Sequence, residues 1–260
     1  MSARGAAPTG AAARIPGYGL ARLAVVACAT LLLLAWLAPP LEHLARRFVF
    51  VETVQFGAFA MGVPALVTLA GPWRGWSTSA ALAVRRLRRH SPWWSVPPVL
   101  LYVVATVAWR TPAAVDGLSR HPLLALAEAP TLGVAGVLLW LELVASPPFS
   151  PRVVRPLRAL LAASAMWTTW IVAYVVGFSH SAWFPVYDRG LRPRLSLVGD
   201  QELATAVLWG LAAAAYVPVV FANLMAWLRN DEDPDDELRR LLRAERRAGG
   251  WGPGPEKRCA

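Results

Sequence analysis

Six long apolar segments constrain this chain more than any other feature of its 260 residues. They cover residues 20–37, 52–70, 95–109, 123–144, 157–178 and 204–228. A helix of about 20 apolar residues crosses about 30 Å of hydrocarbon, and in lipid the backbone must satisfy its own hydrogen bonds. We therefore predict an all-α, polytopic membrane protein with six transmembrane helices.

The composition supports this interpretation over a nucleic-acid-binding protein. The net charge of +10 would suggest a nucleic-acid partner if the chain were polar, but 56% of its residues are hydrophobic and only 16% are charged. A soluble globular domain has roughly 25% charged residues. The composition therefore excludes a disordered basic tail protein, and no nucleic-acid partner is expected.

The distribution of positive charge predicts the orientation. With six spans, the 26 Arg and Lys residues divide into 19 on the side of the two termini and 7 on the other side. Loops on the cytoplasmic side carry the excess of Lys and Arg. Both termini are therefore predicted to be cytoplasmic, in a multi-pass protein of the cell membrane. The acidic residues on the outer side balance the 7 basic ones, so the excess charge faces the anionic inner lipid.

The segments outside the spans differ in character. We expect residues 1–19 to be a flexible cytoplasmic terminus, and residues 20–228 to form the membrane domain. Residues 229–248 are predicted to form a charged cytoplasmic helix, because Asp233-Pro234 combines an N-cap with a proline at the first helical position. Gly and Pro dominate residues 249–260, which predicts a disordered tail.

Several ionisable residues fall at the outer ends of the predicted helices. Glu52 opens the second helix, His121 and Glu128 lie at the start of the fourth, and His180 follows the fifth. Tyr187 and Asp188 also follow the fifth helix, and Asp200-Gln201-Glu202 precedes the sixth. An ionisable group within lipid is costly, so Glu128, two turns into its helix, needs a polar setting. Together these residues predict an outward-facing cluster that could bind a metal ion or a proton, with Glu52, His121, Glu128 and His180 as the metal ligands.

Each of these residues also has a structural interpretation. His121 precedes Pro122 at a helix entry, His180 lies beside aromatic residues typical of a headgroup belt, and Glu52 suits a helix N-terminus. The chain contains no phosphate-binding glycine loop, no nucleophile elbow and no HExxH motif, so we do not expect an enzyme. Its two cysteines, Cys28 and Cys259, have no metal-binding spacing.

Short sequence strings, taken in order, resemble the CtaG family of cytochrome c oxidase assembly factors. The similarity spans about residues 40–227 and rests on these strings: Pro40-Leu41, Leu44-Ala45, Gln55, Pro64, Leu66, Gly71-Pro72-Trp73, His121-Pro122, Glu128, Gly136, Trp140, Phe178-Ser179, Phe184-Pro185-Val186-Tyr187, Asp200-Gln201 and Trp209. The resemblance implies a membrane protein that helps copper reach a haem-copper oxidase at the outer face. Its implied partners are oxidase subunits or a copper carrier.

The chain departs from the family pattern at its histidines. The family's second helix begins with two histidines four residues apart, and these positions are Glu52 and Phe56 here. Histidines also flank the glutamate of the family's fourth helix, at the positions of Ala125 and Ala129. Imidazole suits copper, and alanine and phenylalanine cannot replace it. Two hypotheses therefore stand: copper held at the outer cluster, or assembly by contact without copper on the chain.

Two other functions compete with oxidase assembly. A small transporter or permease predicts polar residues near mid-membrane, often at broken helices, and Pro130 and Pro218 give it slight support. A non-catalytic structural membrane subunit is the other alternative.

Overall fold

The computed structural model describes residues 43–75, 92–179, 181–187 and 195–229, and the elements in these ranges are all helices. In chain order they are α3 (Val49–Gly57), η1 (Ala58–Gly62), α4 (Val63–Ala70), η2 (Pro72–Gly75), η3 (Pro92–Ser95), α6 (Val96–Trp109), α7 (Pro112–Arg120), α8 (Pro122–Leu143), α9 (Arg155–Gly177), η4 (Pro185–Tyr187) and α10 (Leu197–Leu228). The predicted all-α class is confirmed.

Four stretches of helix are long and apolar enough to cross a membrane. They are Val49–Ala70, Leu126–Leu143, Arg155–Gly177 and Leu197–Leu228, and a fifth candidate combines Trp93–Trp109 with Pro112–Leu118, which are bent by 71°. The predicted span at 20–37 lies outside the described residues, as do residues 1–19 and almost all of the predicted charged helix and tail. The count of six spans therefore stays a prediction.

One predicted boundary was wrong, and one helix was not predicted. The third apolar segment ends at Trp109, as predicted, but the chain then turns and continues as α7, whose first turn is capped by the Thr111 hydroxyl. The last helix begins at Leu197 rather than at residue 204. There the Ser196 hydroxyl accepts a hydrogen bond from the Gly199 amide at 3.0 Å. An N-cap of this kind starts a helix whatever the hydropathy of the residues that follow.

The second span contains a π-helical turn, η1, between α3 and α4. Pro64 follows it, and proline cannot donate the backbone hydrogen bond to the residue four positions earlier, here Ala60. The ladder is therefore interrupted at this point, and single π turns are a common accommodation inside α-helices. Gly71, with φ of 56°, ends the span in the left-handed conformation that favours glycine.

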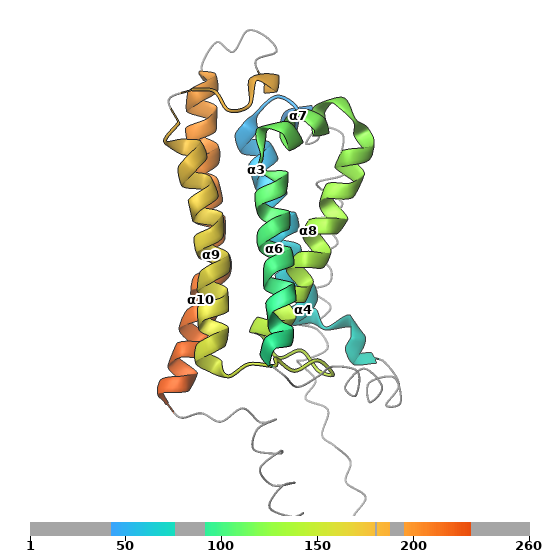
Figure 1. Cartoon of the computed structure of the whole chain (residues 1–260), viewed down its shortest axis with the longest axis vertical. Coiled ribbons are helices and arrows are strands. Elements are labelled where there is room, and N and C mark those ends of the chain that lie inside the picture. Colours follow the sequence, from blue (N-terminus) through green and yellow to red (C-terminus); the bar gives the residue numbers. More distant parts are fainter. Residues whose placement is uncertain (1–42, 76–91, 180, 188–194, 230–260) are drawn as a thin grey trace, which may run out of the picture.

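The helices form an elongated bundle in which α9 and α10 lie side by side along the long axis (Figure 1). Helix α10 also packs against α3. Helix α6 packs against both α8 and α9, and α4 packs against α8. One end of the bundle is crossed by α7; there α3, α8 and α10 begin and α6 and α9 end (Figure 1). We call this the α7 end.

The core contains three large aromatic residues from three helices. Tyr216 of α10 stacks on Trp140 of α8, with ring centroids 5.9 Å apart, and meets Tyr102 of α6 edge-on at 6.3 Å. All three side chains are buried. Aromatic pairs at these separations contribute beyond the area that they bury, so this cluster joins α6, α8 and α10.

Gly136 allows α8 to pack closely against the second span. A Cβ added at Gly136 would lie 2.5 Å from Pro64 and 2.7 Å from the Ala60 carbonyl oxygen. A Cβ added at Gly133 would meet no described atom within 4 Å. The face of α8 that touches the π turn therefore includes Gly136 and not Gly133.

A buried carboxylate fixes the end of the bundle opposite α7. Glu142 accepts a hydrogen bond from the Ser95 hydroxyl at 2.8 Å and forms an ion pair with Arg152 at 2.8 Å. Arg152 also donates to the Trp94 carbonyl oxygen at 2.6 Å. These contacts join η3, the end of α8 and the segment before α9.

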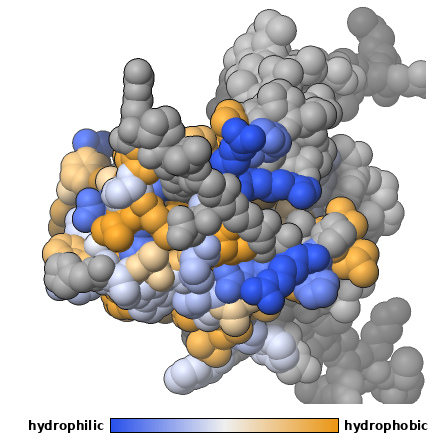
Figure 2. Space-filling view, turned by 90° about the horizontal axis from the view of Figure 1, so that it is seen from above, coloured by the Kyte–Doolittle hydropathy of each residue, from blue (hydrophilic) through white to orange (hydrophobic). Residues whose placement is uncertain are grey.

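The outward faces of the long helices are apolar, which is typical of contact with lipid. Exposed side chains on α8, α9 and α10 include Leu123, Leu126, Val134, Leu160, Trp167, Ile171, Phe178, Val217 and Phe221. Seen from the α7 end, hydrophilic side chains gather in patches between hydrophobic ones (Figure 2). The arrangement supports a multi-pass membrane protein whose polar groups concentrate at its ends.

Candidate functional site

An ion pair between α6 and α3 is the centre of the polar cluster at the α7 end. Arg110 directly follows the last residue of α6, and its Nη1 lies 2.5 Å from Oε2 of Glu52 in the first turn of α3. Nη2 donates to the Thr53 hydroxyl at 2.6 Å. The guanidinium also lies 4.4 Å from the centroid of the Phe56 ring, a favourable cation–π distance. Three residues of α3 therefore hold one cation.

This pair is buried rather than solvated. The side chain of Arg110 is 4% exposed and that of Glu52 is 12% exposed. Removing one partner of a buried pair leaves an uncompensated charge, which is far more costly than the loss of a surface pair. Arg110 and Glu52 consequently behave as one structural unit.

Glu128 brings a second carboxylate to the pair from α8. It interacts electrostatically with both Glu52 and Arg110, and its Oε1 is buried with no hydrogen-bond partner among the described residues. The sequence predicted a polar setting for this residue, and the neighbouring ion pair supplies it. The carboxyl group of Glu128 therefore adds a third ionisable group to the surroundings of the Arg110–Glu52 pair.

Asp200 has a different role, at the start of α3. Its Oδ2 accepts a hydrogen bond from the Val49 amide at 2.9 Å and its Oδ1 accepts one from the Phe50 amide at 3.1 Å. A carboxylate at a helix N-terminus satisfies free amides and complements the helix dipole. Asp200 lies in the first turn of α10 and not before it, contrary to the sequence prediction. One helix therefore caps another.

Gln201, the next residue, connects the outer loop to α9. Its Nε2 donates to the Val176 carbonyl oxygen at 2.7 Å, and its Oε1 accepts from the Trp183 amide at 2.9 Å. The side chain is buried, and buried amides need such partners. It fixes the loop that carries η4 over the end of the bundle.

Tyr187 of η4 is buried in a small apolar cluster with Val49 and Phe184. Burial raises the pKa of its phenol far above the ordinary range; Glu52, Glu128 and Asp200 act in the same direction, and Arg110 opposes them. The phenol therefore stays protonated at neutral pH, next to the two carboxylates and the guanidinium.

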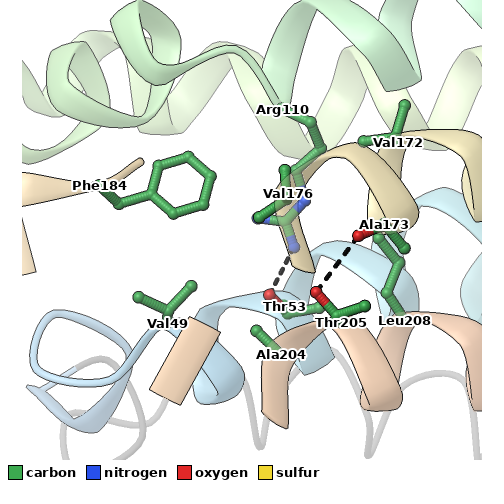
Figure 3. A pocket seen from close by; sticks show the side chains of 10 residues that line it. All are labelled: Val49, Thr53, Arg110, Val172, Ala173, Val176, Phe184, Ala204, Thr205 and Leu208. Carbon is green, nitrogen blue, oxygen red and sulfur yellow. Dashed lines mark hydrogen bonds between the residues drawn. The ribbon is translucent and has the colours of Figure 1, made fainter. Parts of the chain in front are cut away.

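A small cavity of about 20 Å³ lies beside this cluster, between α3, α9 and α10. Figure 3 shows Arg110 reaching toward Thr53 at its edge, with Phe184 across from them and Thr205 hydrogen-bonded to the Ala173 carbonyl oxygen. The other lining residues are apolar. A space of this size holds about one water molecule.

The structure places the four predicted metal ligands in different surroundings. Glu52 lies on α3 and Glu128 on α8, and the two carboxyl groups interact electrostatically. His121 is exposed at the junction of α7 and α8, and His180 lies outside the described residues. Within the described part of the chain, no three His, Cys, Asp or Glu side chains form a group that could hold a metal ion. The four-residue site therefore stays a prediction.

Sequence reasoning missed Arg110 as a member of the cluster. It counted Arg110 only as an outer positive charge. A usable signal was present, because Arg110 directly follows a long apolar run, and a buried acid elsewhere would supply its partner. The position of Arg110 in the sequence does not indicate which acid is its partner, since Glu52 and Glu128 belong to segments distant from it along the chain.

The described residues do not fit copper at the cluster. The available donors are the carboxylates of Glu52 and Glu128 and the hydroxyl of Thr53, while positions 56, 125 and 129 are Phe, Ala and Ala. Copper in proteins favours imidazole and sulfur ligands. The nearest carboxylate is already paired with Arg110.

Comparison with known proteins gives one match. A family model described as "Cytochrome c oxidase caa3 assembly factor (Caa3_CtaG)" matches residues 9–230. Searches of curated proteins and of solved structures gave no match. The matched range includes every residue of the cluster described above.

Proposed function

The chain belongs to the Caa3_CtaG family of cytochrome c oxidase caa3 assembly factors, and from this premise we propose that it assists copper-centre maturation of a haem-copper oxidase by contact, without holding copper at its own polar cluster. The partners would be oxidase subunits or a copper carrier. The observation that carries the proposal is Arg110, whose guanidinium is already paired with Glu52 and hydrogen-bonded to Thr53.

We assign the α7 end to the outer face of the membrane, with both termini in the cytoplasm. The support is the division of Arg and Lys residues, of which 7 of 26 fall on the α7 side. This orientation puts the polar cluster and η4 on the side where a copper centre of the oxidase is completed. It also makes the exposed residues of the loop before Tyr187, among them Ser181, Ala182 and Pro185, the part of the described chain that a partner would meet.

The contact would be made by a pre-formed surface. Gln201 fixes the loop through hydrogen bonds to Val176 and Trp183, and Asp200 fixes the start of α3. A surface held in this way loses little conformational entropy on binding. This favours a docking role over a mobile metal-carrying role.

Deletion of the gene, followed by oxidase activity and spectra with and without added copper, tests the proposal. We expect oxidase activity to be lost and not restored by copper, because a contact function cannot be replaced by the metal. Full restoration by copper would instead indicate copper delivery. Normal oxidase in the deletion strain would refute the assembly function.

A small proton-coupled transporter is the second candidate, and one observation favours it. The hydroxyls of Tyr102, Thr106 and Tyr216 are buried in the bundle with no hydrogen-bond partner among the described residues. Buried polar groups inside a membrane bundle are characteristic of ion and proton paths. Against it, Arg110 lies four residues after Thr106, directly beyond the end of α6, and a fixed positive charge repels protons.

Reconstitution into liposomes containing a pH-sensitive dye separates the two candidates. A potassium diffusion potential would drive proton uptake through a transporter, and Tyr102→Phe with Thr106→Val would reduce it. We expect the same proton leak as in liposomes without protein. A leak that the double substitution abolishes would favour the transporter.

A further inference from the structure

The cavity beside Arg110 and Thr53 takes no part in the contacts that hold the α7 end together. It has a volume of about 20 Å³ and lies between α3, α9 and α10. Eight of the ten residues that line it are buried. The space is therefore inside the bundle and is not a hollow of the molecular surface.

The polar groups at the edge of the cavity already have partners. Arg110 is paired with Glu52 and hydrogen-bonded to Thr53, and the Thr205 hydroxyl is hydrogen-bonded to backbone carbonyl oxygens of α9 and α10. The other lining side chains are apolar. A buried water typically makes about three hydrogen bonds, so the cavity has the size for a water molecule but few groups left to bind one.

We infer that the cavity is a binding site for one small apolar molecule, of the size of dioxygen or xenon, that enters from the hydrocarbon of the membrane. Apolar cavities in proteins stay dry and accept such molecules, which need no hydrogen bonds. Val172 and Thr205, the two lining residues that are partly exposed, belong to α9 and α10, which are both candidate membrane spans. The inference does not depend on the proposed assembly function, because it concerns only this space.

Small side chains on two neighbouring helices create the cavity. Ala173 of α9 and Ala204 of α10 both line it and are buried, and Figure 3 shows Phe184 across the space from Ala173. A Cβ added at Gly177, one turn from Ala173, would lie 2.6 Å from the Thr205 side chain. The two helices are therefore already in close contact at that level and cannot approach further to fill the space.

Methyl NMR of the full-length protein in lipid nanodiscs under xenon pressure tests the inference. Val176 and Leu208 line the cavity, whereas Val134 and Val217 are exposed on the apolar belt. Xenon dissolves in lipid, so the exposed methyl groups should shift in proportion to pressure. We expect the methyl groups of Val176 and Leu208 to shift further and to saturate, as binding at one site requires. A response that stays proportional to pressure at all four residues would overturn the inference.

A substitution that fills the cavity provides the matched comparison. Ala204→Val adds two methyl groups to its wall, and we expect the saturating response at Leu208 to be lost. Ala206→Val makes the same change two residues along α10, at an exposed position, and should leave the response as in the wild type. A saturating response in Ala204→Val, or its loss in Ala206→Val, would refute the site.

Leu208→Ala keeps the test decisive if Ala204→Val does not fold. It enlarges the same cavity by removing most of a lining side chain. We expect the Val176 methyl groups to respond at a lower xenon pressure in this variant than in the wild type. An unchanged or weaker response would contradict binding in this space.

Dioxygen and water supply the remaining arms of the test. Dioxygen is paramagnetic, so its binding should speed the relaxation of the Leu208 methyl groups more than that of the exposed methyl groups of Val217. Equal relaxation at the two residues would overturn the inference. A nuclear Overhauser effect from water to the Val176 methyl groups, without a saturating response to xenon, would also overturn it and would assign the space to a bound water.

Discussion

At the residue scale, a few buried polar side chains determine how the α7 end is built. Arg110 and Glu52 join the end of α6 to α3, Asp200 of α10 caps the start of α3, and Gln201 fixes the outer loop. The sequence predicted that acids would gather here, since Glu52, Glu128 and Asp200 all fall at predicted outer ends. It could not predict their partners, because these lie up to 151 positions away along the chain.

The cap that Asp200 provides makes a quantitative prediction. Asp200→Ala removes the acceptor for two amides at the start of α3, and the loss of a capping side chain costs about 0.5–2 kcal/mol. Since the Asp200 side chain is fully buried, we expect the upper part of this range in the free energy of unfolding in detergent. Glu202→Ala, two residues along on an exposed position, serves as the control. Equal effects of the two substitutions would contradict the capping role.

The burial of Tyr187 predicts a loss of stability in alkali. Its pKa is raised in the folded state, so folding favours the protonated phenol. The stabilisation is present below the unfolded pKa of about 10 and is lost as the pH rises above that value. We expect Tyr187→Phe to reduce the fall in Tm between pH 9 and pH 11. An unchanged fall would show that Tyr187 does not contribute to it.

At the element scale, the lengths of the apolar segments predicted the helices, but capping residues determine where some of the helices begin. The segments predicted at 52–70, 123–144 and 157–178 match their observed helices to within about three residues, because hydropathy and helix length set them together. The start of α10 was missed, since Ser196 and Asp200 are polar residues that begin a helix rather than precede it. The π turn was also missed, because its cause combines Pro64 with the packing of α8.

The contact between α8 and the π turn gives an element-scale prediction. Gly136→Ala would place a Cβ 2.5 Å from Pro64, so the helices must separate, at a cost of about 1–3 kcal/mol. Gly133→Ala meets no described atom within 4 Å and should stabilise the helix by up to about 1 kcal/mol. Thermal unfolding in detergent compares the two. A destabilising Gly133→Ala, or a neutral Gly136→Ala, would argue against this packing.

At the scale of the whole molecule, the fold separates an apolar belt from two polar ends. Exposed apolar side chains such as Val134, Trp167 and Val217 cover the middle, while ion pairs lie at both ends. The sequence predicted this division, because apolar runs and charged residues alternate along it. It also predicted the family. It could not predict that the cation of the cluster belongs to the chain itself.

The orientation predicts which residues are reachable from outside the cell. In a chain with Cys28 and Cys259 replaced by Ala, a cysteine at Ser181 would lie at the α7 end and one at Val154 at the opposite end; both positions are exposed. We expect a membrane-impermeant thiol reagent to label Ser181→Cys in intact cells and Val154→Cys only after permeabilisation. The reverse pattern would invert the topology.

The copper-to-haem ratio of the oxidase purified from a deletion strain tests the central claim most directly. If the chain assists copper-centre maturation, the oxidase that remains should contain its haem but a reduced amount of copper, and expression of the wild-type chain should restore the ratio. The wild-type chain purified from the same cells should carry no stoichiometric copper. An oxidase with full copper in the absence of the chain would contradict the account.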